Sequence, residues 1–424
     1  MRSFRVAALL AVSCSLLAVL LASRSNATRV EPNSAGAPPA PAAVDRDMPA
    51  AGRGSQPPQD RPRGTGATME TKGPWGTLQS FPVFVAAPDW ILETFPLPSA
   101  VTAWTFRGLS SEEVAAVIDR PGLPEPAAAE LLDESRWQIM DDVIRVLPSN
   151  PTVRSLPPDV RGAIYDVLSQ WEENEFQHSP YYIPDNDARG WLAQTGLPEH
   201  LVDLVARTAY PVGKTSCFSD LPLLVAATSN YLEGRSLLKA LSRTQTMILR
   251  VRLDKQTDVA KVRDYWSAGP ANAKDFLPLL ESITTNEDVR HLDIVHLLPP
   301  TARKLLYTFP TPSMAIGGRY PDCHWTSLNF FNPVPEARLA DVAGATMFTL
   351  ENLHPAEPPF AYGDVLFMLD DQGNAIHSCV YLADDYVYTK NGANVLSPWL
   401  IMNLDDVRAR YSRRGPVELK IYRR

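Results

Sequence analysis

The chain has 424 residues, of which 45% are apolar and 21% are charged, and its formal net charge is -8. This composition is typical of globular proteins, and the length suffices for two or three domains with separate cores. The negative balance argues against nucleic acid as a partner, because phosphate binding needs clustered Lys and Arg.

The first 27 residues have the pattern of an export signal. Arg2 and Arg5 precede an apolar run at residues 6–22, and the small residues at 25–27 suit cleavage. The run is close to the roughly 20 residues that span a bilayer, so an uncleaved N-terminal membrane anchor stays open as an alternative. We therefore expect an exported protein of the periplasm or cell envelope.

Residues 28–73 are rich in Pro, Ala, Gly, Ser and Arg and contain few large apolar side chains. Such a segment cannot bury enough surface to offset the entropy lost on ordering. It is predicted to be a disordered linker that spaces the folded part from the membrane or wall.

Residues 74–300 are predicted to form an α-rich domain of unknown role. Apolar residues recur at helical spacing, and prolines divide the region into several short helices. One segment, 246–253, alternates like a strand. One helix is expected to begin near residue 110. The others are expected at residues 137–147, 159–171, 198–208, 220–232 and 257–267.

Residues 301–424 have a different character. Two short helices are expected first, and strands separated by Asp-rich and Gly-containing turns follow. This order favours an α+β fold class for the chain. The helices are expected at residues 301–307 and 322–331, and the strands at 364–369, 375–382, 386–390 and 417–422.

The cysteine count leaves an odd thiol. One of the four cysteines, Cys14, lies in the leader, and Cys217, Cys323 and Cys379 remain. An odd number in an exported protein means that at least one thiol is free or paired between chains.

Cys323 stands where a helix is expected to begin. Pro321 cannot lie inside a helix, and Asp322 is a favoured N-cap residue, so Cys323 would occupy the first helical position. Helix N-termini and nearby histidines favour the reactive thiolate. His377 opens a predicted strand from which it could act as the general base.

A general base of this kind needs a group that orients its ring. Asn391 follows the next predicted strand, and a hairpin could bring it beside His377. Thr389 shares the face of Asn391 by the two-residue alternation of a strand, and it is the second choice.

The ordered motifs of residues 301–424 resemble the NlpC family of papain-like cysteine peptidases. The third catalytic residue of that family is often a histidine on the next strand, whereas Lys390-Asn391 resembles the Lys-Asn pair of papain. The motifs that carry the resemblance are Gly317-Gly318, Asp322-Cys323, residues 362–367 (YGDVLF), and His377 with Tyr381-Leu382.

The resemblance implies a papain-like helix and antiparallel sheet, and a thiol hydrolase that cleaves an amide or peptide bond. It assigns Cys323 as nucleophile, His377 as general base and Asn391 as the orienting residue. The implied substrate is a peptide, such as a peptidoglycan stem or cross-link. No cofactor and no metal are implied.

Two other functions stay open. The chain could be a non-catalytic binding or scaffold protein of the envelope, or it could be an acyl or amide transferase that uses the same thiol. His324 is expected to have a packing or surface role. His291, Asp293 and His296 fit no closed zinc spacing.

Overall fold

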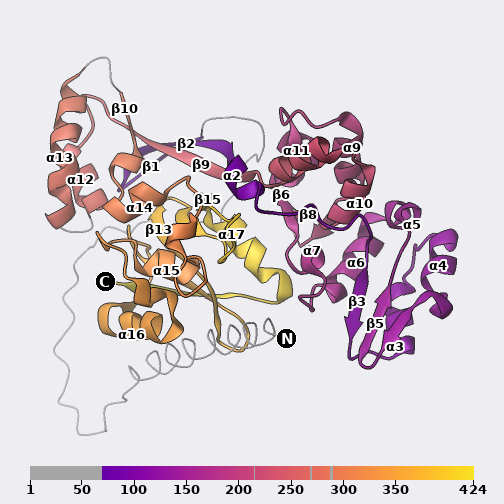
Figure 1. The fold of residues 1–424 in the computed structure, drawn as a ribbon. Helices are drawn as coiled ribbons and strands as arrows, with labels where there is room; N and C mark the ends of the chain where they lie inside the picture. The colour runs from indigo at the N-terminus through magenta and orange to yellow at the C-terminus, as the bar shows by residue number, and fades with distance from the viewer. Residues whose placement is uncertain (1–68, 214, 268–269, 287–289) are drawn as a thin grey trace, which may run out of the picture.

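The computed structural model describes residues 69–424 except 214, 268–269 and 287–289 (Figure 1). It is a mixed α+β structure with several antiparallel sheets, which confirms the predicted fold class at that level. The predicted leader and the predicted linker up to residue 68 lie outside the described residues. No helix in the described part of the chain is long and apolar enough to cross a membrane.

A four-stranded antiparallel sheet joins the beginning of the described chain to its middle. The central pairing is between β2 and β9, in which Val85 is opposite Thr244 and Thr77 is opposite Arg252. The order of the sheet is β1 (Met69–Gly73), β2 (Gly76–Val85), β9 (Thr244–Arg252) and β10 (His291–Asp293). The last five residues of the predicted linker therefore form a strand.

A six-stranded antiparallel sheet lies in the C-terminal part of the chain. Four of its strands follow one another in the chain, and each pairs antiparallel with the next. The last strand of the chain returns to pair with the first of these four. Its order is β11 (His354–Ala356), β16 (Glu418–Arg423), β12 (Val365–Leu369), β13 (Ala375–Ala383), β14 (Tyr386–Lys390) and β15 (Trp399–Asn403).

The two faces of this sheet pack against different helices. Phe367, Val380 and Tyr388 share a core with Trp325 of α15 (Cys323–Leu328). The alternate residues of the same strands pack with Val407 of α17 (Leu404–Tyr411). Alternation along each strand thus decides which helix a side chain meets.

Further helices complete this part of the molecule. Apart from η6, they contribute residues that lie in the same core as α15 or pack against it. They are α12 (Val259–Ser267), α13 (Pro270–Thr285), η3 (Ile294–His296), α14 (Pro300–Leu305), η4 (Pro312–Met314), η5 (Ala337–Ala340), α16 (Val342–Asn352) and η6 (Ser412–Arg414).

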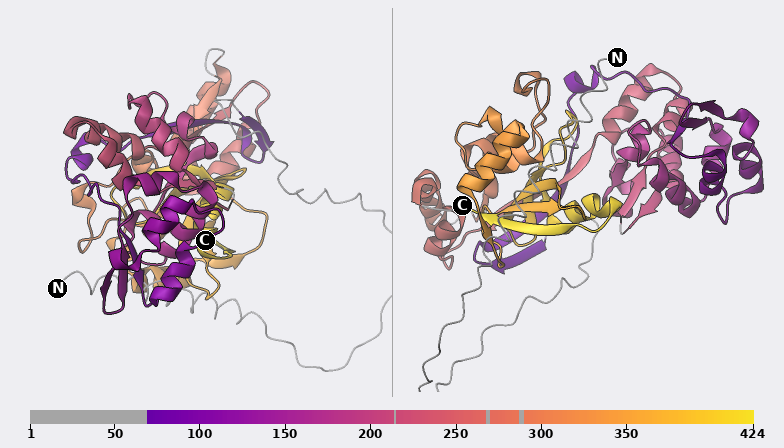
Figure 2. Two further views of the ribbon diagram at one scale, coloured as in Figure 1. Left: turned by 90° about the vertical axis from the view of Figure 1, so that its right-hand side faces the viewer. Right: turned by 90° about the horizontal axis from the view of Figure 1, so that it is seen from below.

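Residues 86–243, here called the middle body, have a core of their own. Figure 1 and the right view of Figure 2 show this body, in purple and magenta, beside the remaining described residues, here called the C-terminal body. Its elements are α2 (Asp89–Leu92), β3 (Trp104–Arg107), α3 (Ser111–Ile118), α4 (Glu125–Leu131), η1 (Glu134–Arg136), β4 (Gln138–Met140), β5 (Val143–Val146), α5 (Asn150–Ser155), α6 (Pro158–Leu168), α7 (Glu175–His178), β6 (Tyr181–Ile183), η2 (Pro184–Asn186), α8 (Ala188–Leu192), α9 (Glu199–Thr208), β7 (Tyr210–Val212), β8 (Thr215–Phe218), α10 (Leu221–Ala227) and α11 (Tyr231–Leu241).

The two cores divide the chain differently from the predicted boundary at residue 300. Leu78, Leu249 and Trp266 pack in one core with Phe367 and Tyr388 of the C-terminal sheet. The middle body is therefore an insertion between β2 and β9, and residues 244–300 belong with the C-terminal body. Pairing between strands so distant in the chain leaves no local sequence pattern.

Most predicted elements are confirmed within a few residues. Segment 246–253 is β9, and the four predicted C-terminal strands are β12, β13, β14 and β16. The helix expected at 220–232 is two helices, because the chain is not helical between Ala227 and Tyr231.

The helix predicted at residues 137–147 is wrong. This segment forms the hairpin of β4 and β5, with Met140 opposite Val143. Asp141 in the turn has a φ of 48°, in the left-handed region that Asp tolerates better than most residues. The β-branched residues on both sides favour strands, and pairing with β3 overrides the helical spacing.

Candidate active site

The start of α15 places Cys323 as expected. The Asp322 side chain accepts a hydrogen bond from the backbone N–H of Trp325 (2.8 Å), which is the geometry of an N-cap. Cys323 is the first helical residue and is 6% exposed. The prediction for this helix start is confirmed, and its thiol is almost enclosed.

His377 lies on β13 and is 0% exposed. It is opposite Met368, whose side chain belongs to the core on the α17 side of the sheet. The imidazole therefore faces α17. Nε2 forms a hydrogen bond with Thr389 Oγ1 (3.0 Å), and Nδ1 is buried without a hydrogen-bond partner.

Electrostatics keep this imidazole neutral at neutral pH. Burial lowers the pKa of His377 well below its usual 6.5, and the neighbouring His324 and Arg410 lower it further. Asp322 acts in the opposite direction but is outweighed. A neutral imidazole with one unpartnered nitrogen can accept a proton.

The side chain that forms a hydrogen bond with His377 is that of Thr389, the second choice, and not that of Asn391. Thr389 follows Val387 on the same face of β14, which brings its hydroxyl to the imidazole. The amide nitrogen of Asn391 instead contacts Met402 Sδ (3.1 Å), and its amide oxygen is buried without a partner. Asn391 lies beyond the end of β14, where the alternation no longer holds its side chain.

Cys323 and His377 lie on neighbouring elements without direct contact. Ser378 points toward α15, and its hydroxyl lies within hydrogen-bond distance of Cys323 O (3.3 Å) and Ser327 Oγ (3.1 Å). No hydrogen bond joins the Cys323 thiol to His377 among the described residues. The thiol and the imidazole are therefore close in the fold but not engaged.

Tyr411, at the end of α17, lies against His377. Its ring stacks on the imidazole of His377, with centroids 4.1 Å apart and planes at 18°. Burial raises the pKa of the Tyr411 phenol, and the nearby Cys323 thiol adds to this rise. Sequence reasoning missed Tyr411, since only the folding of α17 onto the sheet brings it to β13.

Lys390 adds a buried cation to the same region. Its side chain is 0% exposed and donates hydrogen bonds to Gly392 O (2.7 Å) and Asn394 O (3.1 Å). Burial lowers the pKa of Lys390 to about 8, although Asp322 and Cys323 oppose this change. In mildly alkaline solution, the Lys390 side chain is therefore neutral in part of the molecules.

His324 is held by packing contacts, as expected. Its Nδ1 contacts Ser378 Oγ (3.0 Å), its Nε2 contacts Ala375 O (3.2 Å), and its ring stacks on Phe367. Cys217 and Cys379 are 0% exposed, and all three described cysteines are free. Cys323 is the most accessible of the three thiols.

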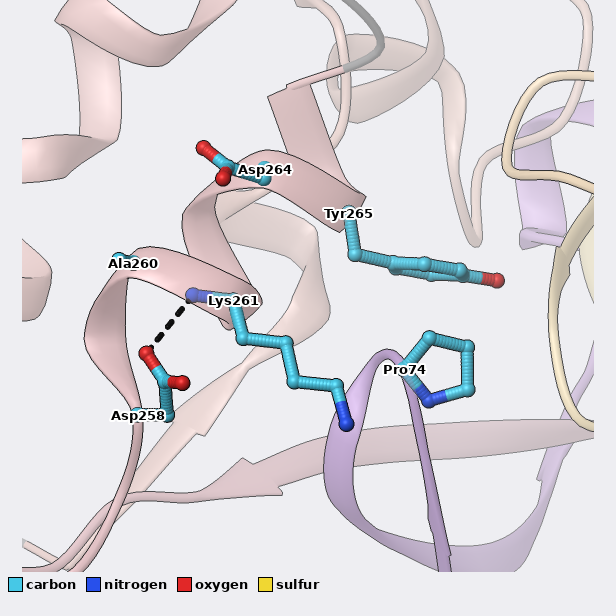
Figure 3. A pocket seen from close by; sticks show the side chains of 6 residues that line it. All are labelled: Pro74, Asp258, Ala260, Lys261, Asp264 and Tyr265. Carbon is cyan, nitrogen blue, oxygen red and sulfur yellow. Dashed lines mark hydrogen bonds between the residues drawn. The ribbon is translucent and has the colours of Figure 1, made fainter. Parts of the chain in front are cut away.

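An open pocket lies away from this cluster. It has a volume of about 430 Å³ between the β1–β2 turn and α12, and its lining includes Pro74, Lys261 and Tyr265 (Figure 3). Tyr265 donates a hydrogen bond to Leu382 O, near the end of β13 opposite to His377. No group of three or more potential metal ligands occurs within the described ranges.

Comparisons of the chain with models of protein families, with curated proteins and with solved structures found no match.

Proposed function

We propose that the protein is an exported thiol hydrolase that cleaves an amide bond of a peptide, with Cys323 as nucleophile and His377 as general base. The observation that carries this proposal is the state of His377: a neutral, buried imidazole held at Nε2 with Nδ1 unpartnered. A peptide of the cell wall is the substrate class that the resemblance to the NlpC family suggests.

In the proposed reaction, His377 Nδ1 accepts the thiol proton while Cys323 Sγ attacks the amide carbonyl. The tautomer with its proton on Nε2 donates to Thr389 Oγ1, which leaves the lone pair of Nδ1 for this transfer. Burial disfavours the imidazolium, so the proton passes readily to the leaving amine. Water then hydrolyses the thioester and returns the thiol.

Two further features support these roles. The backbone N–H of Cys323 is at the start of α15, where helical N–H groups lack intrahelical partners, and it can stabilise the oxyanion. Tyr411 and Thr389 restrict the imidazole from two sides. Substrate binding must bring thiol and imidazole together, since catalytic hydrogen bonds are often long in unliganded enzymes.

The first test is alkylation of the full chain with iodoacetamide, followed by mass spectrometry. Cys323 should react faster than the fully buried Cys217 and Cys379, which serve as internal controls. Cys323→Ala should abolish the fast labelling. Fast labelling that survives Cys323→Ala would disprove the assignment of the nucleophile.

The second test is incubation with peptidoglycan fragments, with and without an added amine. Release of a free amine and a carboxylate, lost in Cys323→Ala, supports the hydrolase. Capture of the acyl group by the added amine would show a transferase instead.

A second candidate function is a non-catalytic envelope scaffold. The observation that favours it is the hydroxyl of Ser378, which points toward α15 where a catalytic histidine would be expected. In that case Cys323 should react no faster than the two fully buried thiols, and no fragment should be cleaved.

A further inference from the structure

The middle and C-terminal bodies meet at a row of side chains on the β6–β8–β7 sheet. Tyr182 is opposite Cys217 in one strand pair, and Cys217 is opposite Tyr210 in the next. Directly opposite residues of antiparallel strands project to the same face. This row of Tyr182, Cys217 and Tyr210 meets the end of α17.

Two arginines of the C-terminal body lie over this row. The guanidinium of Arg410 stacks 4.2 Å from the centre of the Tyr182 ring, and the Tyr182 hydroxyl donates a hydrogen bond to Arg410 O (3.1 Å). Burial raises the pKa of the Cys217 thiol to about 11, and the positive charges of Arg413 and Arg410 moderate this rise. The contact with Tyr182 places Arg410 at this junction, and Arg413 follows it three residues later in η6.

Arg413 is unusual because its charged group is enclosed without partners. All three guanidinium nitrogens, Nε, Nη1 and Nη2, are buried and make no hydrogen bond. No ion pair of Arg410 or Arg413 occurs among the described residues. A buried cation without a counter-charge is strongly disfavoured, so such a group calls for an anion.

Arg161 of the middle body shows how the same fold treats a buried guanidinium that has a structural role. It pairs with Asp220 and donates hydrogen bonds to Tyr165 and to the backbone carbonyl groups of Val153 and Leu156. The chain provides no such set around Arg413. Arg161 thus has hydrogen-bond partners and a counter-charge, whereas Arg413 lacks an anion.

We propose that Arg413 and Arg410 form an oxyanion site at the junction of the two bodies, for a ligand that carries a carboxylate or a phosphate group. Guanidinium groups present forked N–H donors that match both oxyanions. Access requires movement of η6, a single turn followed by the exposed residues Gly415 and Pro416. The proposal does not rest on the proposed hydrolase chemistry, although Arg410 also lowers the pKa of His377.

The test is thermal unfolding of the full chain in sodium phosphate, sodium acetate and sodium chloride at equal ionic strength. Phosphate, acetate or both should raise the Tm of the unaltered chain by roughly 2–4 °C at several times Kd, relative to chloride. A response to phosphate alone assigns a phosphoryl ligand, and a response to acetate alone assigns a carboxylate.

Arg413→Met should lose this response, and in chloride its Tm should equal or exceed that of the unaltered chain, because an unpaired charge has been removed. Arg410→Met should weaken the response, and it provides an independent variant. Arg408→Met is the matched control, since Arg408 is an exposed residue of the same helix, and it should respond like the unaltered chain.

Two outcomes would overturn the proposal. One is an equal response of all four proteins, which would show a general salt effect. The other is a Tm of Arg413→Met that falls in every buffer, which would show that the guanidinium is already satisfied by protein or water.

Discussion

A buried cluster of the middle body and one of the C-terminal body treat charged side chains in opposite ways. In the middle body, Arg161 and Asp220 are both 0% exposed and pair with each other. In the C-terminal body, His377 and Lys390 are equally buried, but no carboxylate pairs with either among the described residues. The consequence appears in their charge states.

The pKa of the paired Arg161 moves toward the charged form, whereas those of the unpaired Lys390 and His377 move toward the neutral form. Burial also raises the pKa of Asp220, although Arg161 and Tyr165 oppose this rise. Burial works to lower the pKa of Arg161, but Asp220 and Tyr165 outweigh it and raise that pKa. Burial prevails at Lys390 and His377, whose pKa values are lowered. The first cluster therefore serves the fold, and the second retains groups that can exchange protons, which suits chemistry.

The largest expected effect comes from breaking the completed network. Asp220→Leu should destabilise the protein by about 3–5 kcal/mol, because it leaves a buried guanidinium without its counter-charge. Urea unfolding measures this loss. The double variant Arg161→Met/Asp220→Leu should recover most of it.

Glu199→Gln is the matched surface control, because Glu199 pairs with Arg189 through side chains that are 75% and 57% exposed. It should cost at most about 1 kcal/mol. A loss at Asp220→Leu no larger than this would contradict the contrast between the two bodies.

The next effect concerns Lys390. Its pKa is about 8 when folded against an ordinary 10.5, so the folded protein loses this proton first as the pH rises. The free energy of unfolding should therefore increase between pH 8 and 10.5, by up to about 3 kcal/mol in total. Lys390→Met lacks this increase. Parallel stability curves for the two proteins would contradict the prediction.

His377 should produce a stability change on the acid side. Its folded pKa is below 6.5, so the unfolded chain takes up this proton first as the pH falls. The free energy of unfolding should decline below pH 6.5 by up to about 1.4 kcal/mol per pH unit, and His377→Asn should lack this component. The denaturant midpoints of the unaltered chain and of His377→Asn, measured from pH 7.5 to 5, should diverge below pH 6.5. Curves that stay parallel over this range would contradict the prediction.

The smallest effect distinguishes Thr389 from Asn391. Thr389→Val should cost about 1 kcal/mol and slow cleavage of the peptidoglycan fragments about tenfold, because the imidazole loses its hydrogen bond at Nε2. Asn391→Ala should leave this cleavage unchanged, since its amide contacts Met402. The reverse order of the two variants would restore Asn391 as the orienting residue.

Local patterns predicted the C-terminal elements well. The strands β12, β13 and β14 have β-branched and aromatic runs between clear turns, and Asp322 is a strong helix start before Cys323. The same reasoning failed at residues 137–147, where helical spacing competed with a turn at Asp141. Spacing alone could not show that this segment pairs with β3.

The candidate site was predictable in part for the same reason. Sequence position indicated Cys323 at a helix start and His377 on a strand, and both positions are confirmed. The face that His377 occupies depends on its register with Met368, which no local pattern specifies. Tyr411 and the enclosed Arg413 depend on where α17 packs.

The sequence by itself determined the α+β class, the C-terminal strands and the helix start at Cys323, because propensities, caps and turns act over a few residues. Only the tertiary structure decided that β2 pairs with β9 across the middle body, that Thr389 holds His377, and that Arg413 is enclosed between the bodies. These features depend on contacts between distant segments. Their free energy comes from burial and pairing that exist only after the chain has folded.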